Sequence, residues 1–263
     1  MISRFWPIRW MRRASSHRKL LSKQYVKGED WFRWPYPKFA SWSLTVILPA
    51  TLCSARQFHL GGIGHVFHTP MFALEVDGKP CGIVPRAIGG SYAVLVAEQL
   101  LASGARIVVG LTSAGRVSQI LRIPSLVIAT AAIRDEGTSF HHLPPSKSVA
   151  APPNPVAPLA SELERLGAGL SRKVWTTDAP YRETRQQLER YGEEGVLAVE
   201  MQAASLFALA QARKAQIAVV AHVSNATDHE GEPFDRGPET EGVQVLMAVC
   251  RAGLVLSRNN QSG

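Results

Sequence analysis

Four short clusters of glycine and small polar residues are the first candidates for chemistry in this sequence. They are Gly-Gly-Ser at 89–91, Thr-Ser-Ala-Gly at 112–115, Thr-Thr-Asp at 176–178 and Ser-Asn at 224–225. Each cluster follows a predicted strand, and in α/β folds ligands gather at the carboxyl ends of strands. Glycine turns that open helices also present backbone N–H groups to anions. The clusters therefore indicate an anion site, although a glycine after a strand often only makes a turn.

Other residues that carry chemistry are poorly placed for it. His141 and His142 are neighbours, so on a helix or a strand their side chains point apart, which is poor geometry for a metal. Ser139 has no base and orienting acid that the sequence reveals. The three cysteines are too few and too scattered for a disulfide framework or a zinc site. We therefore expect no metal site.

The elements that must position these clusters alternate between strands and helices. Apolar and β-branched runs predict strands at 72–76, 81–88, 106–111, 124–133, 173–176, 196–199 and 217–223. Apolar stripes predict helices at 90–103, 182–191, 201–214 and 238–257. The proline-rich stretch 144–158 is expected to be a surface loop. Strands interleaved with helices predict an α/β sandwich with a parallel or mixed sheet.

The first 42 residues differ from the rest in charge and composition. They hold ten of the 29 basic residues and two of the 21 acidic residues, a net charge of +8, so the remaining chain is neutral. They also hold five of the six tryptophans and show no helical or strand periodicity. We expect 1–42 to be a poorly ordered extension and 43–263 to be the folded domain.

The extension leaves some questions of partner and compartment open. Its arginine and serine content, with no acid before Glu29, loosely resembles a mitochondrial transit peptide. The basic extension could instead contact nucleic acid or another anionic surface. The rest of the chain is neutral, however, and this argues against nucleic-acid binding by the folded domain. No run approaches the roughly 20 apolar residues of a membrane-spanning helix. We therefore expect a cytoplasmic protein that binds neither nucleic acid nor membrane.

Three segments carry a resemblance to a known family. Residues 132–145 read Ala-Ile-Arg-Asp-Glu-Gly-Thr-Ser-Phe-His-His-Leu-Pro-Pro, residues 174–184 read Val-Trp-Thr-Thr-Asp-Ala-Pro-Tyr-Arg-Glu-Thr, and residues 195–204 read Gly-Val-Leu-Ala-Val-Glu-Met-Gln-Ala-Ala. In this order and spacing they resemble the nucleoside phosphorylase/uridine phosphorylase family. The resemblance implies a three-layer α/β/α sandwich around a mixed, twisted central sheet. It also implies homo-oligomers (dimers, trimers or hexamers) with active sites near subunit contacts.

The reaction that the resemblance implies is cleavage of the N-glycosidic bond of a purine nucleoside or uridine. Phosphate is the nucleophile and co-substrate, the products are a free base and ribose 1-phosphate, and no metal or organic cofactor is needed. Such cleavage requires a grip on the ribose as it gains oxocarbenium character, a hydrogen bond or proton for the leaving base, and a positioned nucleophile.

The ribose contacts that the resemblance implies include one departure from the family pattern. Met201 would pack on the ribose, while Gln202 occupies the position of a glutamate that binds the ribose hydroxyls. Neutral glutamine stabilises a cationic sugar less well than a carboxylate does. Glu200 belongs to the same substrate-binding motif, but neighbouring side chains point in different directions, so it does not simply replace that carboxylate.

The phosphate and base contacts are implied in the same way. Ser113 would bind phosphate, but the arginine that the family commonly has three residues earlier is replaced by Gly110, so Arg86 and Arg116 are the candidate substitutes. The side chains expected to line the sugar and base pocket are Thr177 and Tyr181, and Asn225 stands where purine-specific relatives have a catalytic aspartate. An asparagine amide pairs with a 6-oxopurine or a similar base but supplies no proton.

Three functions therefore stay open at this stage. The first is a nucleoside phosphorylase, in which Gln202 and Asn225 are the catalytic candidates. The second is a nucleoside hydrolase on the same fold, favoured by Gly110 because loss of phosphate arginines is typical of the hydrolytic branch. The third is a catalytically impaired homologue that binds a nucleoside without turnover, a reading motivated by Gln202.

Overall fold

The computed structural model of the chain describes residues 44–49, 63–66, 69–166, 169–227 and 239–259. The chain divides into two units, Met1–Phe39 and Ala40–Gly263, and the described residues all belong to the second. The predicted extension 1–42 lies outside the described residues, so its lack of order stays a prediction.

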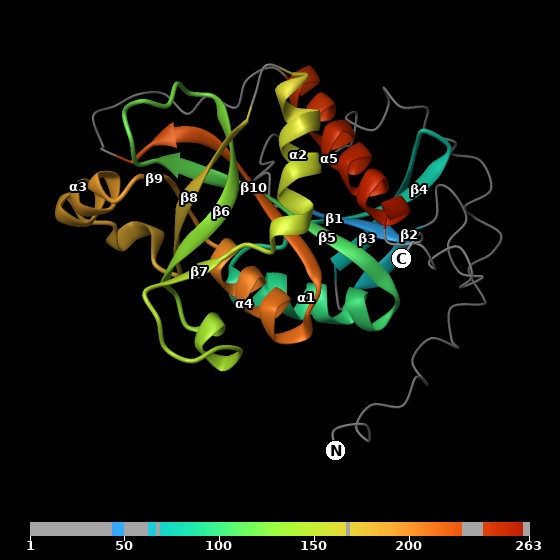
Figure 1. Cartoon of the computed structure of the whole chain (residues 1–263), viewed down its shortest axis with the longest axis horizontal. Coiled ribbons are helices and arrows are strands. Elements are labelled where there is room, and N and C mark those ends of the chain that lie inside the picture. Colours follow the sequence, from blue (N-terminus) through green and yellow to red (C-terminus); the bar gives the residue numbers. More distant parts are fainter. Residues whose placement is uncertain (1–43, 50–62, 67–68, 167–168, 228–238, 260–263) are drawn as a thin grey trace. The chain divides into compact units, whose positions relative to one another are not determined.

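Ten strands and five α-helices make up the described part of the chain (Figure 1). The strands are β1 (Leu44–Pro49), β2 (Ile63–Val66), β3 (Thr69–Val76), β4 (Lys79–Pro85), β5 (Ala105–Arg116), β6 (Ser125–Asp135), β7 (Ser148–Ala150), β8 (Leu170–Thr177), β9 (Val196–Glu200) and β10 (Gln216–Ala226). The helices are α1 (Gly90–Ala102), α2 (Pro153–Glu164), α3 (Arg185–Glu193), α4 (Ala203–Arg213) and α5 (Glu239–Asn259).

The sheet is mixed, and part of it closes on itself. Strands β6, β8 and β9 run parallel to one another, and β5 runs parallel to β10. The two groups meet through antiparallel pairs, β10 with β6 and β5 with β9, so these five strands form a ring. Strands β1, β4, β3 and β2 extend the sheet outward from β5. The mixed central sheet that was predicted is therefore confirmed.

Strand β5 exchanges one neighbour for another along a single edge. Strand β10 occupies one edge of β5 from Ile107 to Arg116. On the opposite edge, β1 pairs with β5 as far as Leu111, and β9 pairs only with Gly115 and Arg116. Residues 112–114 pair with neither strand, and we call this gap the fork. A point where strands part is the usual place for a ligand site in an α/β sheet.

Helices cover both faces of the sheet, as Figure 1 shows, with α2 and α5 above and α1 and α4 below. The pleat of β5 separates the two cores, since Val108 packs with Phe207 of α4 while Ile107 packs with Val249 of α5. Trp175 of β8 packs on Tyr191 of α3, with ring centroids 4.8 Å apart. These layers confirm the predicted three-layer α/β/α sandwich.

The predicted surface loop 144–158 is wrong in part. Residues 148–150 form β7, which pairs with β6, and α2 begins at Pro153. A proline in the first turn of a helix costs little, because its missing N–H has no partner there in any case. The proline content that predicted a loop therefore marks the start of a helix.

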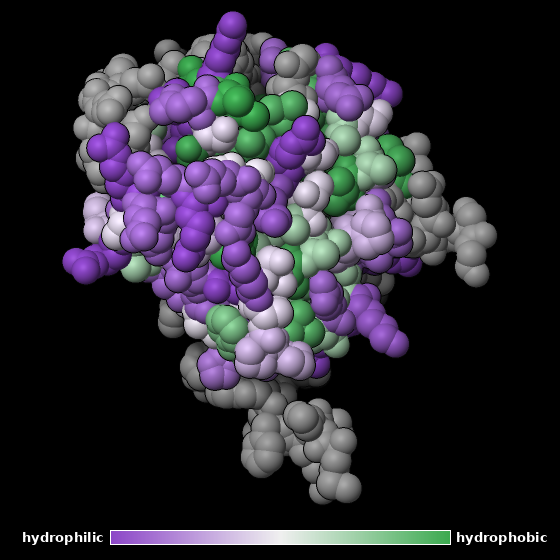
Figure 2. All heavy atoms as spheres, turned by 60° about the vertical axis from the view of Figure 1, so that its left-hand side comes forward, coloured by the Kyte–Doolittle hydropathy of each residue, from purple (hydrophilic) through white to green (hydrophobic). Residues whose placement is uncertain are grey.

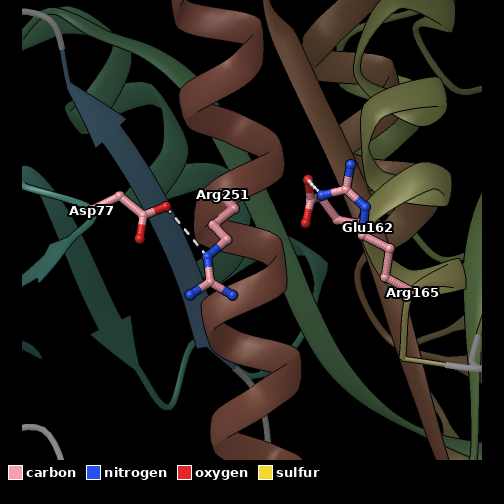
Figure 3. A network of polar contacts seen from close by, with 4 residues as sticks. All are labelled: Asp77, Glu162, Arg165 and Arg251. Atoms are coloured by element: carbon pink, nitrogen blue, oxygen red, sulfur yellow. Dashed lines mark hydrogen bonds and ion pairs between the residues drawn. The ribbon is translucent and has the colours of Figure 1, made fainter.

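The surface carries several ion pairs and is largely hydrophilic around α3. Arg251 of α5 contacts Asp77 in the β3–β4 turn at 3.3 Å, and Glu162 of α2 pairs at 2.8 Å with Arg165, the residue that follows this helix (Figure 3). Exposed pairs of this kind add little to stability. Figure 2 turns the α3 side forward and shows mostly hydrophilic residues there. No helix in the described ranges is long and apolar enough to cross a membrane.

Candidate functional site

The fork contains Ser113 of the predicted cluster 112–115 and lies between the strands β1 and β9 that pair with β5. Ser113 lies in the stretch of β5 that pairs with β10 but with neither β1 nor β9, and it is half-buried. On one side, β4 ends at Pro85, which pairs with Leu44 of β1, and Arg86 follows. On the other side, β9 ends and is followed by Met201, which is half-buried, at the start of α4.

Gln202 links the two sides of the fork. It is the N-cap residue of α4 and is 1% exposed, and its Nε2 donates a hydrogen bond to the carbonyl of Ala87. Its Oε1 has no hydrogen-bond partner among the described residues and lies 3.7 Å from where a Cβ on Gly110 would be. Buried polar atoms are nearly always paired, so an orphaned acceptor in a candidate site points to a missing donor.

Glu200 anchors the start of α4 from inside the core. Its carboxylate accepts hydrogen bonds from Thr176 Oγ1 at 2.6 Å and from the backbone N–H groups of Gln202 and Ala203 at 2.6 and 3.0 Å. Burial raises the pKa of the Glu200 carboxyl to about 7, although these three hydrogen bonds act to lower it. The nearby charge of Glu136 adds to the rise. Glu200 therefore gains and loses a proton near neutral pH.

The basic candidates lie on both sides of Ser113. Arg86 is exposed and has a positive φ of 63°, directly after β4. Arg116 is 9% exposed at the end of β5, where its carbonyl accepts a hydrogen bond from Thr227 Oγ1 at 2.6 Å. Leu111 packs on the α5 side of β5 and Ala114 on the α4 side, so the pleat places Ser113 on the face opposite Gln202.

The base-pocket candidates are less closely grouped. Thr177 ends β8, is 3% exposed and accepts a hydrogen bond from the backbone N–H of Ala179 at 3.2 Å. Tyr181 lies in a short 3₁₀ turn and is 99% exposed. Asn225 is half-buried at a bulge in β10, and its Nδ2 lies 3.4 Å from where a Cβ on Gly115 would be. The fold thus places Asn225 beside β5 and leaves the Tyr181 ring in the open.

Several residues near the fork gained no role from the sequence alone. Thr176 Oγ1 accepts a hydrogen bond from the backbone N–H of Ala204 at 2.9 Å, and Ser205 donates one to Glu136. Glu136 was visible within a motif, but its partner is 69 positions away in the chain. Burial also raises the pKa of Glu183, in the segment after Tyr181, to about 7.

The described residues offer no cluster of three or more His, Cys, Asp or Glu side chains that could hold a metal ion. His141 is exposed and His142 is half-buried, and they end a short 3₁₀ helix (138–141) that contains Ser139. What the fork offers instead is hydrogen-bonding groups and two arginines, which suit a polar organic ligand and an anion.

The sequence of this chain is similar to those of known proteins. The model of the phosphorylase superfamily matches residues 55–256. Uridine phosphorylase of Escherichia coli is 23% identical over 224 residues, which cover 79% of this chain and 84% of that protein. Guanosine phosphorylase of Halorubrum lacusprofundi is 28% identical over 143 residues, which cover 51% of this chain and 56% of that protein. The matched range of the superfamily includes every residue described above at the fork from β4 onward.

Proposed function

Because this chain belongs to the phosphorylase superfamily, we propose that it cleaves the N-glycosidic bond of a nucleoside with phosphate as the nucleophile. The products are a free base and ribose 1-phosphate, and phosphate is the co-substrate without a further cofactor. The printed names of the relatives, uridine phosphorylase and guanosine phosphorylase, make uridine and purine nucleosides the substrates to examine first.

The observation that carries this proposal is the match of the phosphorylase superfamily over residues 55–256, and the buried, orphaned Oε1 of Gln202 supports it. A ribose hydroxyl is a donor of the right kind for this acceptor, and the amide of Gln202 is already held by Ala87. Met201, which follows β9 directly, packs on the sugar in this proposal. Glu200 contributes to sugar binding indirectly, because its hydrogen bonds fix the backbone at the start of α4, next to Met201 and Gln202.

The nucleophile and the base occupy the two ends of the fork in this proposal. Arg86 and Arg116 supply positive charge for phosphate. The side chain of Ser113 points to the face of β5 opposite Gln202, so this proposal does not rest on a hydrogen bond from Ser113 to the phosphate that attacks the sugar. Thr177 lines the base, and the Asn225 amide hydrogen-bonds to the base as it leaves. The ring of Tyr181 is 99% exposed and is left out of this pocket. A glutamine and an asparagine in the catalytic positions leave the site without a carboxylate that contacts the sugar or a group that donates a proton to the base, so we expect slow turnover.

Hydrolysis is the second candidate, and the surroundings of Gly110 favour it. A Cβ on Gly110 would lie 3.1 Å from Leu206 Cδ1 and 3.4 Å from Val219 Cγ2. The third neighbour of this position is Oε1 of Gln202 at 3.7 Å, so none of the three nearest side chains is a cation that would attract phosphate. Water would then replace phosphate as the nucleophile, on the same sugar and base contacts.

The test is release of free base from uridine, guanosine, inosine and adenosine by the full chain, measured by HPLC with and without phosphate. Phosphate-dependent release supports phosphorolysis, and equal release without phosphate supports hydrolysis. No release by the folded protein would overturn both proposals in favour of a homologue that only binds.

A matched pair of variants connects activity to the fork. Gln202→Ala removes the orphaned acceptor, and we expect nucleoside KM to rise about tenfold or more. Gln211→Ala is the control, because Gln211 lies on the same helix but is exposed and bonds to the carbonyl of Ala150. Equal KM values in both variants would contradict the role of Gln202.

We further propose that the chain forms a homo-oligomer (a dimer, trimer or hexamer), is cytoplasmic, and binds neither nucleic acid nor membrane. Membership of a superfamily of small-molecule enzymes and a neutral body support this proposal. Light scattering on the purified chain tests the assembly, and a monomer at micromolar concentration would contradict it.

A further inference from the structure

The segment 134–139, in which Arg134, Glu136 and Ser139 are buried, has no role in the proposed reaction, although it is part of a long sequence motif. Arg134 is 6% exposed, and its guanidinium donates hydrogen bonds to Ser139 Oγ (2.8 Å), Ser146 Oγ (2.7 Å) and the carbonyls of Leu143 (3.2 Å) and Pro144 (2.7 Å). These bonds all close the loop 134–146 on itself. Arg134 is therefore a loop-building residue, and the contact with the rest of the site comes from elsewhere in the segment.

Glu136 makes that contact. It is 7% exposed, and its carboxylate accepts hydrogen bonds from the backbone N–H of Ser139, at 3.0 Å, and from Ser205 Oγ on α4. Ser205 is fully buried, so its hydroxyl needs this acceptor. The loop thus fixes the orientation of one side chain in the first turn of α4.

Ser205 in turn presses on the first residue of α1. A Cβ on Gly90 would lie 2.1 Å from Ser205 Oγ and 2.9 Å from Ser205 Cβ, distances that no real side chain tolerates. The backbone of Gly90 therefore rests directly on the serine. Only glycine allows α1 and α4 to begin this close together.

Segment 86–90 is consequently held by α4 at two points. Gln202 donates to the carbonyl of Ala87, and Ser205 supports Gly90. Between these points, Gly89 has a positive φ of 84°, and Arg86 ahead of them has one of 63°. A segment with two left-handed residues keeps such a conformation only where its surroundings fix it.

We propose that Glu136 is a positioning residue of the nucleoside site. By accepting the hydroxyl of Ser205, it orients this serine against Gly90, and the contact fixes segment 86–90. That segment carries Arg86 and the carbonyl that holds the Gln202 amide. This inference rests on the proposed function for its catalytic consequence, but its structural part can be measured without turnover.

Hydrogen exchange of the full chain tests the structural part. In Ser205→Ala and Glu136→Ala, we expect backbone amides in 86–92 to exchange about tenfold faster than in the native chain. Ser146→Ala is the matched control, because it weakens the same loop at its exposed end and leaves Glu136 and Ser205 in place. Unchanged exchange in 86–92, or equal acceleration in the control, overturns the inference whether or not the chain is active.

Steady-state kinetics test the functional part. A positioning role predicts that Ser205→Ala and Glu136→Ala raise nucleoside KM about tenfold, while kcat stays within about threefold. Glu136→Gln keeps an oxygen acceptor for Ser205 and is expected to recover most of the native KM. A fall in kcat at unchanged KM would show only a smaller folded fraction and would overturn the positioning role.

A second pair of variants guards against simple misfolding. Gly90→Ala is expected to raise KM more than Ser205→Ala does, because the new methyl group collides with Ser205. Adding Ser205→Gly removes the colliding atoms, so KM of the double variant should fall back toward that of Ser205→Gly alone. No recovery overturns the contact. A native chain without base release would instead overturn the proposed function and leave the exchange result valid.

Discussion

Helices α1 and α4 begin side by side at the fork, but their first turns are held in different ways. At α4, the free N–H groups of Gln202, Ala203 and Ala204 bond to Glu200 and Thr176. At α1, the N-cap residue is Gly89, and no side chain in the described part of the chain caps the helix. The α4 start is satisfied by buried side chains from β8 and β9, whereas the α1 start is placed by contacts with α4.

This difference gives the two helix starts different roles: the start of α4 is structural, whereas the start of α1 can bind an anion. The first N–H groups of a helix attract an anion only when no side chain has taken them. The α4 start has lost that capacity, although it lies in one of the three sequence motifs. The α1 start keeps it, and it lies next to Arg86. We infer that α4 orients the sugar contacts while the charge that attracts phosphate comes from the α1 side.

The largest expected effect comes from removing the α4 anchor. Glu200→Ala leaves the Thr176 hydroxyl and two backbone N–H groups buried without an acceptor, and we expect unfolding free energy to fall by about 3 kcal/mol near pH 6. Urea unfolding measures this. A loss below about 1 kcal/mol would mean that the α4 start is not held by this carboxyl.

The pH dependence of stability also tests the role of the Glu200 carboxyl at the start of α4. The pKa of Glu200 is about 7 in the folded chain against 4.5 for an ordinary glutamate, so between these values the folded chain holds a proton that the unfolded chain has lost. Stability should therefore fall as pH rises through this window, by about 3 kcal/mol in all, and level off above it. Urea midpoints from about pH 5 to about pH 8 check this.

Two variants separate the carboxyls that titrate in this window. Glu200→Gln should remove most of the slope, since the amide does not titrate. Glu183→Gln is the control, because burial raises the pKa of Glu183 to about 7 as well, but this side chain is only partly buried and its contribution is smaller. An unchanged slope in Glu200→Gln would show that Glu200 is not the titrating group.

Gln202→Glu tests the link between the two helices. A glutamate would turn a carboxylate oxygen toward the carbonyl of Ala87 in place of the Nε2 donor, in a position that is 1% exposed. We expect a loss of about 2 kcal/mol in stability near pH 8, smaller at low pH where the new carboxyl is protonated. Unchanged stability together with faster base release would contradict this, and it would support the reading of this chain as a catalytically impaired homologue.

The smallest expected effect tests the open start of α1. Ser91→Glu adds a negative charge to the exposed first turn, which has no acidic residue, and should stabilise the helix by about 0.5 kcal/mol. If phosphate binds near this turn, the same charge raises the KM for phosphate and leaves that for the nucleoside unchanged. Ser103→Glu at the other end of α1 is the control, since the helix dipole disfavours it.

The sequence predicted most of the fold because its signals are local. Apolar and β-branched runs located the strands from β3 onward except β7, which lies in the predicted loop, and the stripe at 201–214 located α4 to within a few residues of its ends. Helix α2 was missed because prolines in a first turn resemble those of a loop. The capping box of Thr184 and Gln187 explains why α3 begins three residues later than predicted.

The candidate site was predicted only in part, because its contacts join distant positions. The motifs named Gln202 and Glu200, but the partner of the Gln202 amide is 115 positions away, at Ala87. Ser113 was placed at a strand end, whereas it lies inside β5, where the neighbouring strand changes. No local sequence pattern predicts this change of neighbouring strand, because it depends on where the pairing with β1 ends and the pairing with β9 begins.

By itself, the sequence determined the family and the chemistry of the side chains available. Three motifs and a neutral body were enough to imply a nucleoside enzyme, because residue types and their spacing are written along the chain. Only the tertiary structure decided which of these groups are already satisfied. Glu200 and Thr176 are used to build α4, while Oε1 of Gln202 is left without a partner among the described residues. Satisfaction of buried polar atoms depends on packing between distant segments, and packing exists only in the folded chain.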